Sequence, residues 1–215
     1  MIIPIGIQCT NGNFKREINK ATKSYPFDWI FSPPKFIYEM LYLLLEKNME
    51  IDKLVKEEFF LCDTNASVNV NFLENYYTDI NGFALLNSKY NVVFPHDVRN
   101  NETIEKYVRR FERLKVSILN SNEKIIFLYS SQASLNIGNY TVNNTEVITN
   151  VYYYLSKIQN LLEKYNNNFK IIIFDTIKNE DKKLLNDKIM LIELNESYHW
   201  IDIINQMLQH KHHFE

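Results

Sequence analysis

The chain has 215 residues, of which 46% are hydrophobic and 23% charged, and this composition excludes a disordered protein and a small disulfide-stapled scaffold. Its 24 basic and 26 acidic side chains leave a formal charge of -2, which argues against a dedicated nucleic-acid or membrane-surface binder. The first apolar run lacks the features of an export signal, and no window reaches the ~20 apolar residues that span a bilayer. We therefore predict a cytoplasmic protein without a nucleic-acid or membrane partner, with Cys9 and Cys62 as free thiols.

The first element expected is a buried strand over residues 2–7, followed by residues 13–20, which could begin a helix. Two prolines at positions 33 and 34 suit the start of a helix over residues 33–47. A second, short helix is expected over residues 51–60. These two helices begin an insertion, different in sequence pattern from the rest of the chain, that continues to about residue 100.

The second half of this insertion has the pattern of short β-strands. Strands are expected over residues 67–72, 82–86 and 90–94, and the turn-like residues 87–89 make the last two a hairpin. A helix over residues 103–119 then leads back to the sheet.

Strands alternate with helices through the last third of the chain. Apolar runs at residues 124–129, 170–175 and 189–194 have the length of buried parallel strands. Apolar stripes at helical spacing predict helices over residues 145–165 and 197–209. We predict a single α/β domain over residues 1–215, with a mostly parallel central sheet flanked by helices, Rossmann-like or similar to Ser-Gly-Asn-His hydrolases. The helical and β-hairpin insertion, at about residues 33–100, follows strand 1.

Cys9 stands where the first strand gives way to a polar turn, and active sites of open α/β sheets form at such strand ends. Exposed amides stabilise a thiolate there, which favours a nucleophilic cysteine. The alternative is a small buried hydrophobe at a strand end.

Four motifs occur in the first half of the chain: GIQC at residues 6–9, YPFDWIFS at 25–32, FPHD at 94–97 and KYVRRFER at 106–113. Together they resemble a family of bacterial and large-virus proteins labelled papain-like cysteine peptidases. The resemblance covers roughly residues 2–130 and implies an active site of Cys9, His96 and Asp97. Gln8 directly precedes Cys9, whereas papain-like enzymes place their oxyanion glutamine several residues upstream. The abundance of Asn, Ile, Lys and Tyr is typical of an AT-rich bacterial or viral genome.

A second arrangement fits the expected sheet. Hydrolases of the Ser-Gly-Asn-His type place an Asp-x-x-His pair after the last strand, and Glu196 and His199 follow residue 194 here. His199 is therefore a second candidate for the general base. The alternative is the first turn of a helix, capped by Asn195 or Ser197.

Two further groups suggest substrate contacts. Asp28 and Trp29 lie in an aromatic, proline-rich segment that suits a sugar by hydrogen bonding and stacking, and equally suits a buried capping Asp. Arg109, Arg110 and Arg113 share a helix and could clamp a phosphate or carboxylate. We expect internal ion pairs for these arginines, with Asp28, Asp97 or Glu112.

No zinc-ligand spacing is present, and four glycines exclude the usual nucleotide fingerprints, so neither a metal nor a cofactor is expected. The first hypothesis is a cysteine hydrolase or acyltransferase acting on an ester, amide or thioester of a small molecule, peptide or glycan. Cys9 is its nucleophile, His96 or His199 its base, and Asp97 or Glu196 the partner of the imidazole. Gln8, Asp28, Trp29 and Arg110 are its candidate substrate contacts. A glycan-modifying transferase and a non-catalytic binding module are the alternatives, and the sequence does not indicate an oligomeric state.

Overall fold

The computed structural model describes twelve stretches of the chain. They are residues 1–6, 10–18, 23–61, 85–94, 97–98, 100–120, 122–130, 141–142, 145–146, 150–175, 186–195 and 200–214.

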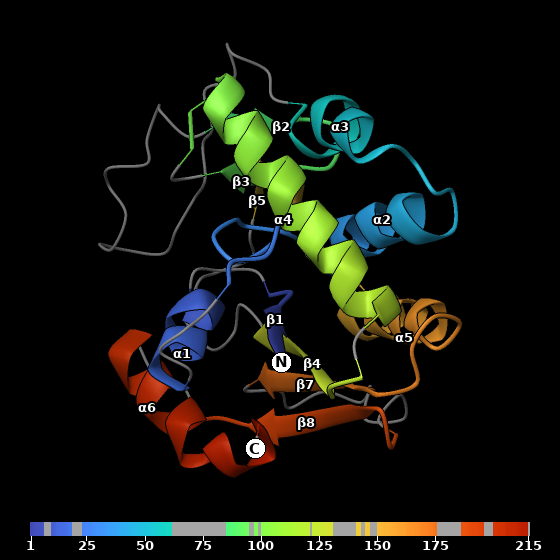
Figure 1. Ribbon diagram of the computed structural model, residues 1–215. Coiled ribbons are helices and arrows are strands. Elements are labelled where there is room, and N and C mark those ends of the chain that lie inside the picture. Colours follow the sequence, from blue (N-terminus) through green and yellow to red (C-terminus); the bar gives the residue numbers. More distant parts are fainter. Residues whose placement is uncertain are drawn as a thin grey trace.

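A parallel sheet of four strands forms the centre of the structure (Figure 1). Its strands, in spatial order, are β1 (Ile2–Pro4), β4 (Ile125–Ser130), β7 (Phe169–Asp175) and β8 (Ile189–Glu193). Ile3, Phe127, Ile171 and Ile189 stand in register across all four strands. The strands are almost wholly apolar because both faces of the sheet are covered. The predicted α/β class with a mostly parallel sheet is confirmed, while its finer Rossmann-like or hydrolase-like type stays a prediction.

Helices cover both faces of this sheet and make a three-layered structure (Figure 1). Helices α1 (Thr10–Ile18) and α6 (Trp200–Gln209) pack on one face, where Phe14 and Met207 meet Ile172 of the sheet. The opposite face is covered by α2 (Pro34–Leu45), α4 (Asn101–Asn120) and α5 (Val151–Leu162). Fully buried side chains of these helices include Phe36, Phe111 and Leu155.

The segment between α2 and α4 begins with α3 (Ile51–Leu54), which continues as the π-helical turn η1 (Val55–Phe59). The hairpin of β2 (Leu85–Asn87) and β3 (Val92–Phe94) follows after the undescribed residues 62–84, so the strand predicted over 67–72 lies outside the described residues. Phe59 packs edge-on against Phe94 and Phe111 at ring distances of 5.4 and 4.8 Å. These contacts join the hairpin to α4.

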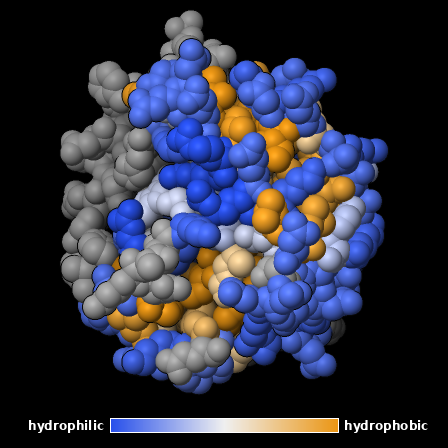
Figure 2. Space-filling view, in the orientation of Figure 1, coloured by the Kyte–Doolittle hydropathy of each residue, from blue (hydrophilic) through white to orange (hydrophobic). Residues whose placement is uncertain are grey.

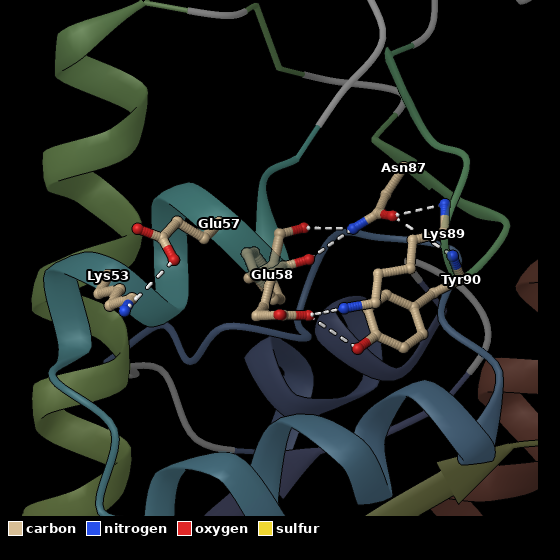
Figure 3. A network of polar contacts seen from close by, with 7 residues as sticks. Lys53, Glu57, Glu58, Asn87, Lys89 and Tyr90 are labelled. Atoms are coloured by element: carbon tan, nitrogen blue, oxygen red, sulfur yellow. Dashed lines mark hydrogen bonds and ion pairs between the residues drawn. The ribbon is translucent and has the colours of Figure 1, made fainter.

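The side chain of Asn87 ties the hairpin to η1 (Figure 3). Its Nδ2 donates to the backbone carbonyls of Glu58 at 2.7 Å and Phe59 at 3.1 Å. Its Oδ1 accepts from the backbone amides of Lys89 at 3.1 Å and Tyr90 at 3.3 Å. Asn87 is fully buried, and the Glu58 carboxylate accepts from Lys89 and Tyr90 beside it. One buried amide thus satisfies four backbone groups.

Asn87→Ala is expected to lower the free energy of unfolding by about 2–3 kcal/mol, because it leaves buried carbonyls without a donor. Urea unfolding measures the loss. The control is Glu57→Ala, which removes only an exposed ion pair to Lys53 at 3.7 Å in the same region and should cost under about 1 kcal/mol. Equal losses for the two variants would contradict the role assigned to Asn87.

Two helix starts differ from those predicted. The helix after the first strand was expected from residue 13 and begins at Thr10. The helix expected from residue 145 begins at Val151, because Asn150 has a left-handed backbone (φ 54°, ψ 42°) that cannot continue a helix. Thr145 and Glu146 instead form strand β6, which pairs with β5 (Thr141–Val142).

Where the described residues cover them, the other predicted elements agree with the structure within a few residues, and the helix expected over 51–60 is π-helical in its second half. A short 3-10 turn, η5 (Lys211–Phe214), follows α6. Among the described residues, no helix combines the length and apolar character needed to cross a membrane. The cytoplasmic location stays a prediction, as do the single domain and the bounds of its insertion.

Candidate functional site

Buried polar groups gather where the parallel strands end. Ser130 at the end of β4, Asp175 at the end of β7 and Asn11 in the first turn of α1 are 2%, 3% and 0% exposed. Among the described residues, neither side-chain atom of Asn11 has a hydrogen-bond partner, and the same holds for the buried Tyr129 hydroxyl. Since most buried polar atoms in proteins are paired, this edge of the sheet stands out as a site.

Gly6 allows the strand end and α1 to meet at this edge. A Cβ at position 6 would lie 1.7 Å from Asn11 Nδ2 and 2.9 Å from the Ser130 amide nitrogen. The chain then passes through residues 7–9, so Gln8 and Cys9 lie outside the described residues. Helix α1 begins at the residue that follows Cys9.

An open pocket of about 360 Å³ lies beside α1, lined by side chains from separate parts of the chain. The lining residues are Arg16, Trp29, Asp97, Lys106 and Arg110. Trp29 lies along α1, where its ring would be 3.2 Å from a Cβ at Gly12 and carries the Arg16 guanidinium 4.3 Å from its centroid. A Cβ at Gly12 would also lie 2.8 Å from the Asp28 carbonyl oxygen, so Gly12 is needed where this part of the chain meets α1. Gly12 and Arg16 share one face of α1.

Asp97 forms the opposite wall of the pocket, and its side chain is 4% exposed. One carboxylate oxygen pairs with the Lys106 ammonium. The other accepts a hydrogen bond from the Tyr107 hydroxyl at 2.5 Å. Both partners belong to α4, so Asp97 anchors the chain next to His96 on that helix. His96 itself lies outside the described residues.

The described lining of the pocket carries more positive than negative charge. Among these described residues, three side chains are cationic and one is a carboxylate. Among the described residues, neither Arg16 nor Arg110 forms an ion pair. Figure 2 shows strongly hydrophilic residues over α4 on this side of the molecule. The pocket is thus suited to an anionic ligand.

The three arginines of α4 have different surroundings. Arg109 is exposed and pairs with Glu105 at 3.8 Å, and Arg113 donates to the backbone carbonyl of Ser24. The guanidinium of Arg110 lies 5.3 Å from the ring centroid of Tyr107. Among the described residues none of them pairs with Asp28, Asp97 or Glu112, so the expected internal ion pairs are wrong. The ion pair of Asp97 is formed by Lys106 of the same helix instead.

Asp28 lies in the core, and its residue is 3% exposed. Its Oδ2 pairs with Lys15 Nζ at 3.1 Å, and Oδ1 has no hydrogen-bond partner among the described residues. Burial raises the pKa of Asp28 and lowers the pKa of Lys15, while their mutual attraction opposes both shifts. Lys15 also donates to the carbonyl of Lys23 at 2.7 Å. Asp28 thus ties the turn at residues 26–29, here called the Trp29 turn, to Lys15 of α1. It is not part of the pocket lining.

Three predicted residues, Trp29, Asp97 and Arg110, meet in the pocket. The candidates Gln8, Cys9, His96, Glu196 and His199 lie outside the described residues. Arg16 and Lys106 also line the pocket and were not predicted from the sequence. A helix starting at residue 10 would have indicated Arg16, because it places positions 12 and 16 on one face.

No cluster of three or more His, Cys, Asp or Glu side chains that could hold a metal ion occurs within the described stretches. What the described pocket offers instead is cationic groups beside an aromatic ring.

A comparison with protein-family models finds one family, described as “Putative papain-like cysteine peptidase”, that matches residues 1–174. Comparisons with curated proteins and with solved structures give no match. The family match contains the strand end, α1, the Trp29 turn and the pocket-lining part of α4.

Proposed function

Because the chain belongs to this family of “putative papain-like cysteine peptidases”, we propose that it is a cysteine hydrolase in which the thiolate of Cys9 attacks an ester, amide or thioester carbonyl. The observation that carries this proposal is the pocket, whose lining combines a side chain of α1 with the residue that follows His96. Arg16 belongs to the helix that starts one residue after Cys9, and Asp97 directly follows His96.

Helix α1 supports a reactive thiol at position 9. The first backbone amides of a helix have no partner within the helix, and they carry the positive end of its dipole. A thiolate just before the first turn is stabilised by these amides, which lowers the thiol pKa. The same amides are donors for the oxyanion that forms when the thiolate adds to the carbonyl.

In the proposed reaction, the imidazole of His96 takes the thiol proton and the sulfur bonds to the carbonyl carbon. The imidazolium then protonates the leaving group as its bond to carbon breaks, leaving an acyl-thioester on Cys9. Water attacks this thioester with the imidazole as base, which releases the acid and restores the thiol. A different acceptor in place of water would make the same chemistry an acyl transfer.

Asp97 is a positioning residue in this scheme. Its two oxygens are engaged by Lys106 and Tyr107, so it holds the backbone beside His96 against α4. His96 is preferred to His199 because it lies within the family match, which ends at residue 174. His199 also follows β8, which stands three strands away from β1 in the sheet, or about 14 Å at the usual strand spacing.

The direct test is the pH dependence of iodoacetamide labelling at Cys9, followed by mass spectrometry of the labelled peptide. The proposal expects a labelling midpoint well below the ordinary thiol pKa of about 8.5. Cys62, the second cysteine of the chain, is the internal control and should titrate near that value. A midpoint for Cys9 at or above 8.5 would overturn the proposal.

A glycan-modifying transferase is the second candidate, because the charge and aromatic ring of the pocket also suit the phosphates of an activated sugar. That activity would not need Cys9. Survival of activity in Cys9→Ala separates it from the hydrolase.

A further inference from the structure

The two guanidinium groups of the pocket are held by aromatic rings and not by carboxylates. Arg16 lies over Trp29 at 4.3 Å, and Arg110 lies over Tyr107 at 5.3 Å. A cation–π contact does not use the N–H groups of a guanidinium as a carboxylate pair would. Among the described residues, both arginines therefore keep donors for an anionic ligand.

The charges inside the pocket are not balanced. Asp97 is matched by Lys106, with Tyr107 donating to its second oxygen. Asp28 is buried behind Trp29 and matched by Lys15. The described lining has three cations against one carboxylate, an excess of two positive charges.

We propose that Arg16, Lys106 and Arg110, together with Trp29, bind a phosphate monoester group of a small ligand. Such a group carries about two negative charges near neutral pH and presents three oxygens to donors from several directions. A single carboxylate would balance only half of the excess charge. A volume of about 360 Å³ lies at the small end of ligand pockets, which suits a compact polar group.

In the hydrolase, binding of the phosphate would position the acyl group of the same substrate next to Cys9. Only this positioning role rests on the proposed function. Phosphate recognition itself needs only the pocket. The substrate class that follows is a phosphorylated ester, amide or thioester.

The test is a fluorescence titration with phenyl phosphate. The chain has two tryptophans, so Trp200→Phe leaves Trp29 as the only reporter, and Trp29 stacks on one of the proposed ligating arginines. We expect a saturable change in Trp29 emission that weakens as salt is added. No saturable change up to millimolar phenyl phosphate would overturn the inference.

Variants of α1 and α4 provide the matched comparison. Arg16→Gln and Arg110→Gln should each weaken phenyl phosphate binding about tenfold, since each removes a charge-assisted contact. Arg109→Gln is the control, because Arg109 is next in the chain, exposed, paired with Glu105 and outside the pocket lining. Equal weakening by Arg109→Gln would reduce the effect to general surface charge and overturn the site. Arg16 is exposed, so its variant decides the question if Arg110→Gln does not fold.

Two other ligands test the chemical class. Phenyl sulfate has the shape of the phosphate ester with one charge, and phthalate has two charges on two planar groups. Binding of either as tight as that of phenyl phosphate would overturn the phosphate assignment.

Cys9→Ala keeps this inference separate from the hydrolase. The phosphate site expects unchanged phenyl phosphate binding in that variant, and a loss of binding would contradict it. Phosphate binding with an ordinary Cys9 thiol would retain the site and reject the hydrolase, whereas a reactive Cys9 without phosphate binding would do the reverse.

Discussion

Replacing Cys9 with alanine should reduce the hydrolysis of an activated ester or thioester by at least ~10³-fold, because it removes the nucleophile that forms the covalent intermediate. Turnover is measured as nitrophenolate release from p-nitrophenyl esters. Phosphorylated acyl substrates are tested beside unphosphorylated ones.

Cys62→Ala is the matched control for this loss. It removes the other thiol of the chain and should leave turnover unchanged. If Cys9→Ala retains full activity in a purified, folded protein, the cysteine mechanism fails and the glycan-modifying transferase gains support.

The same assay distinguishes the two histidines. His96→Ala should cause a loss of ~10²-fold or more, as expected for removal of a general base. His199→Ala should leave kcat nearly intact. If instead His199→Ala causes the large loss, His199 is the general base and Cys9 remains the nucleophile.

The four strands of the central sheet were predictable because each is a short apolar run covered on both faces. The run at residues 170–175, for example, needs no long-range information to be recognised as β7. The start of α5 was not predictable, because nothing in the apolar stripe from residue 145 indicates the left-handed backbone of Asn150. Periodicity identifies a helix more reliably than it identifies its first residue.

The pocket was only partly predictable for a related reason. Trp29, Asp97 and Arg110 attracted attention as residue types within motifs, and the structure brings them together. Arg16 did not, because Gly12 is a poor helix former that obscured the true start of α1. That glycine is required because the Asp28 carbonyl oxygen lies only 2.8 Å from where a Cβ would be, which is a tertiary contact. Likewise, nothing in the sequence indicates that Asp28 pairs with Lys15 and not with an arginine of α4.

Removal of the buried partner of Lys15 is expected to have the largest effect on stability. Asp28→Ala should lower the free energy of unfolding by about 3–5 kcal/mol, because it leaves the Lys15 ammonium without its counter-ion in the core. The two side chains are 4% and 5% exposed, so water cannot replace the carboxylate. Urea unfolding of the variant measures the loss.

Two comparisons make this prediction specific. Asp52→Ala removes a shorter ion pair, 2.7 Å from Lys56, whose side chains are half exposed, and should cost under about 1 kcal/mol. The double variant Lys15→Met, Asp28→Leu should recover most of the stability lost in Asp28→Ala, since it removes both buried charges. A double variant as unstable as Asp28→Ala would mean that shape and not charge fixes the Trp29 turn.

The pH dependence of stability provides an independent check on the same pair. Burial raises the pKa of Asp28 above its ordinary 3.8, so on raising the pH the unfolded chain loses this proton before the folded protein does. The stability that this group contributes is therefore complete below pH 3.8 and is lost as the pH rises through the folded-state pKa. Relative to the double variant, the wild-type free energy of unfolding should fall over this acidic range. A rise there would show that the attraction of Lys15 outweighs burial and holds the Asp28 pKa below its ordinary value.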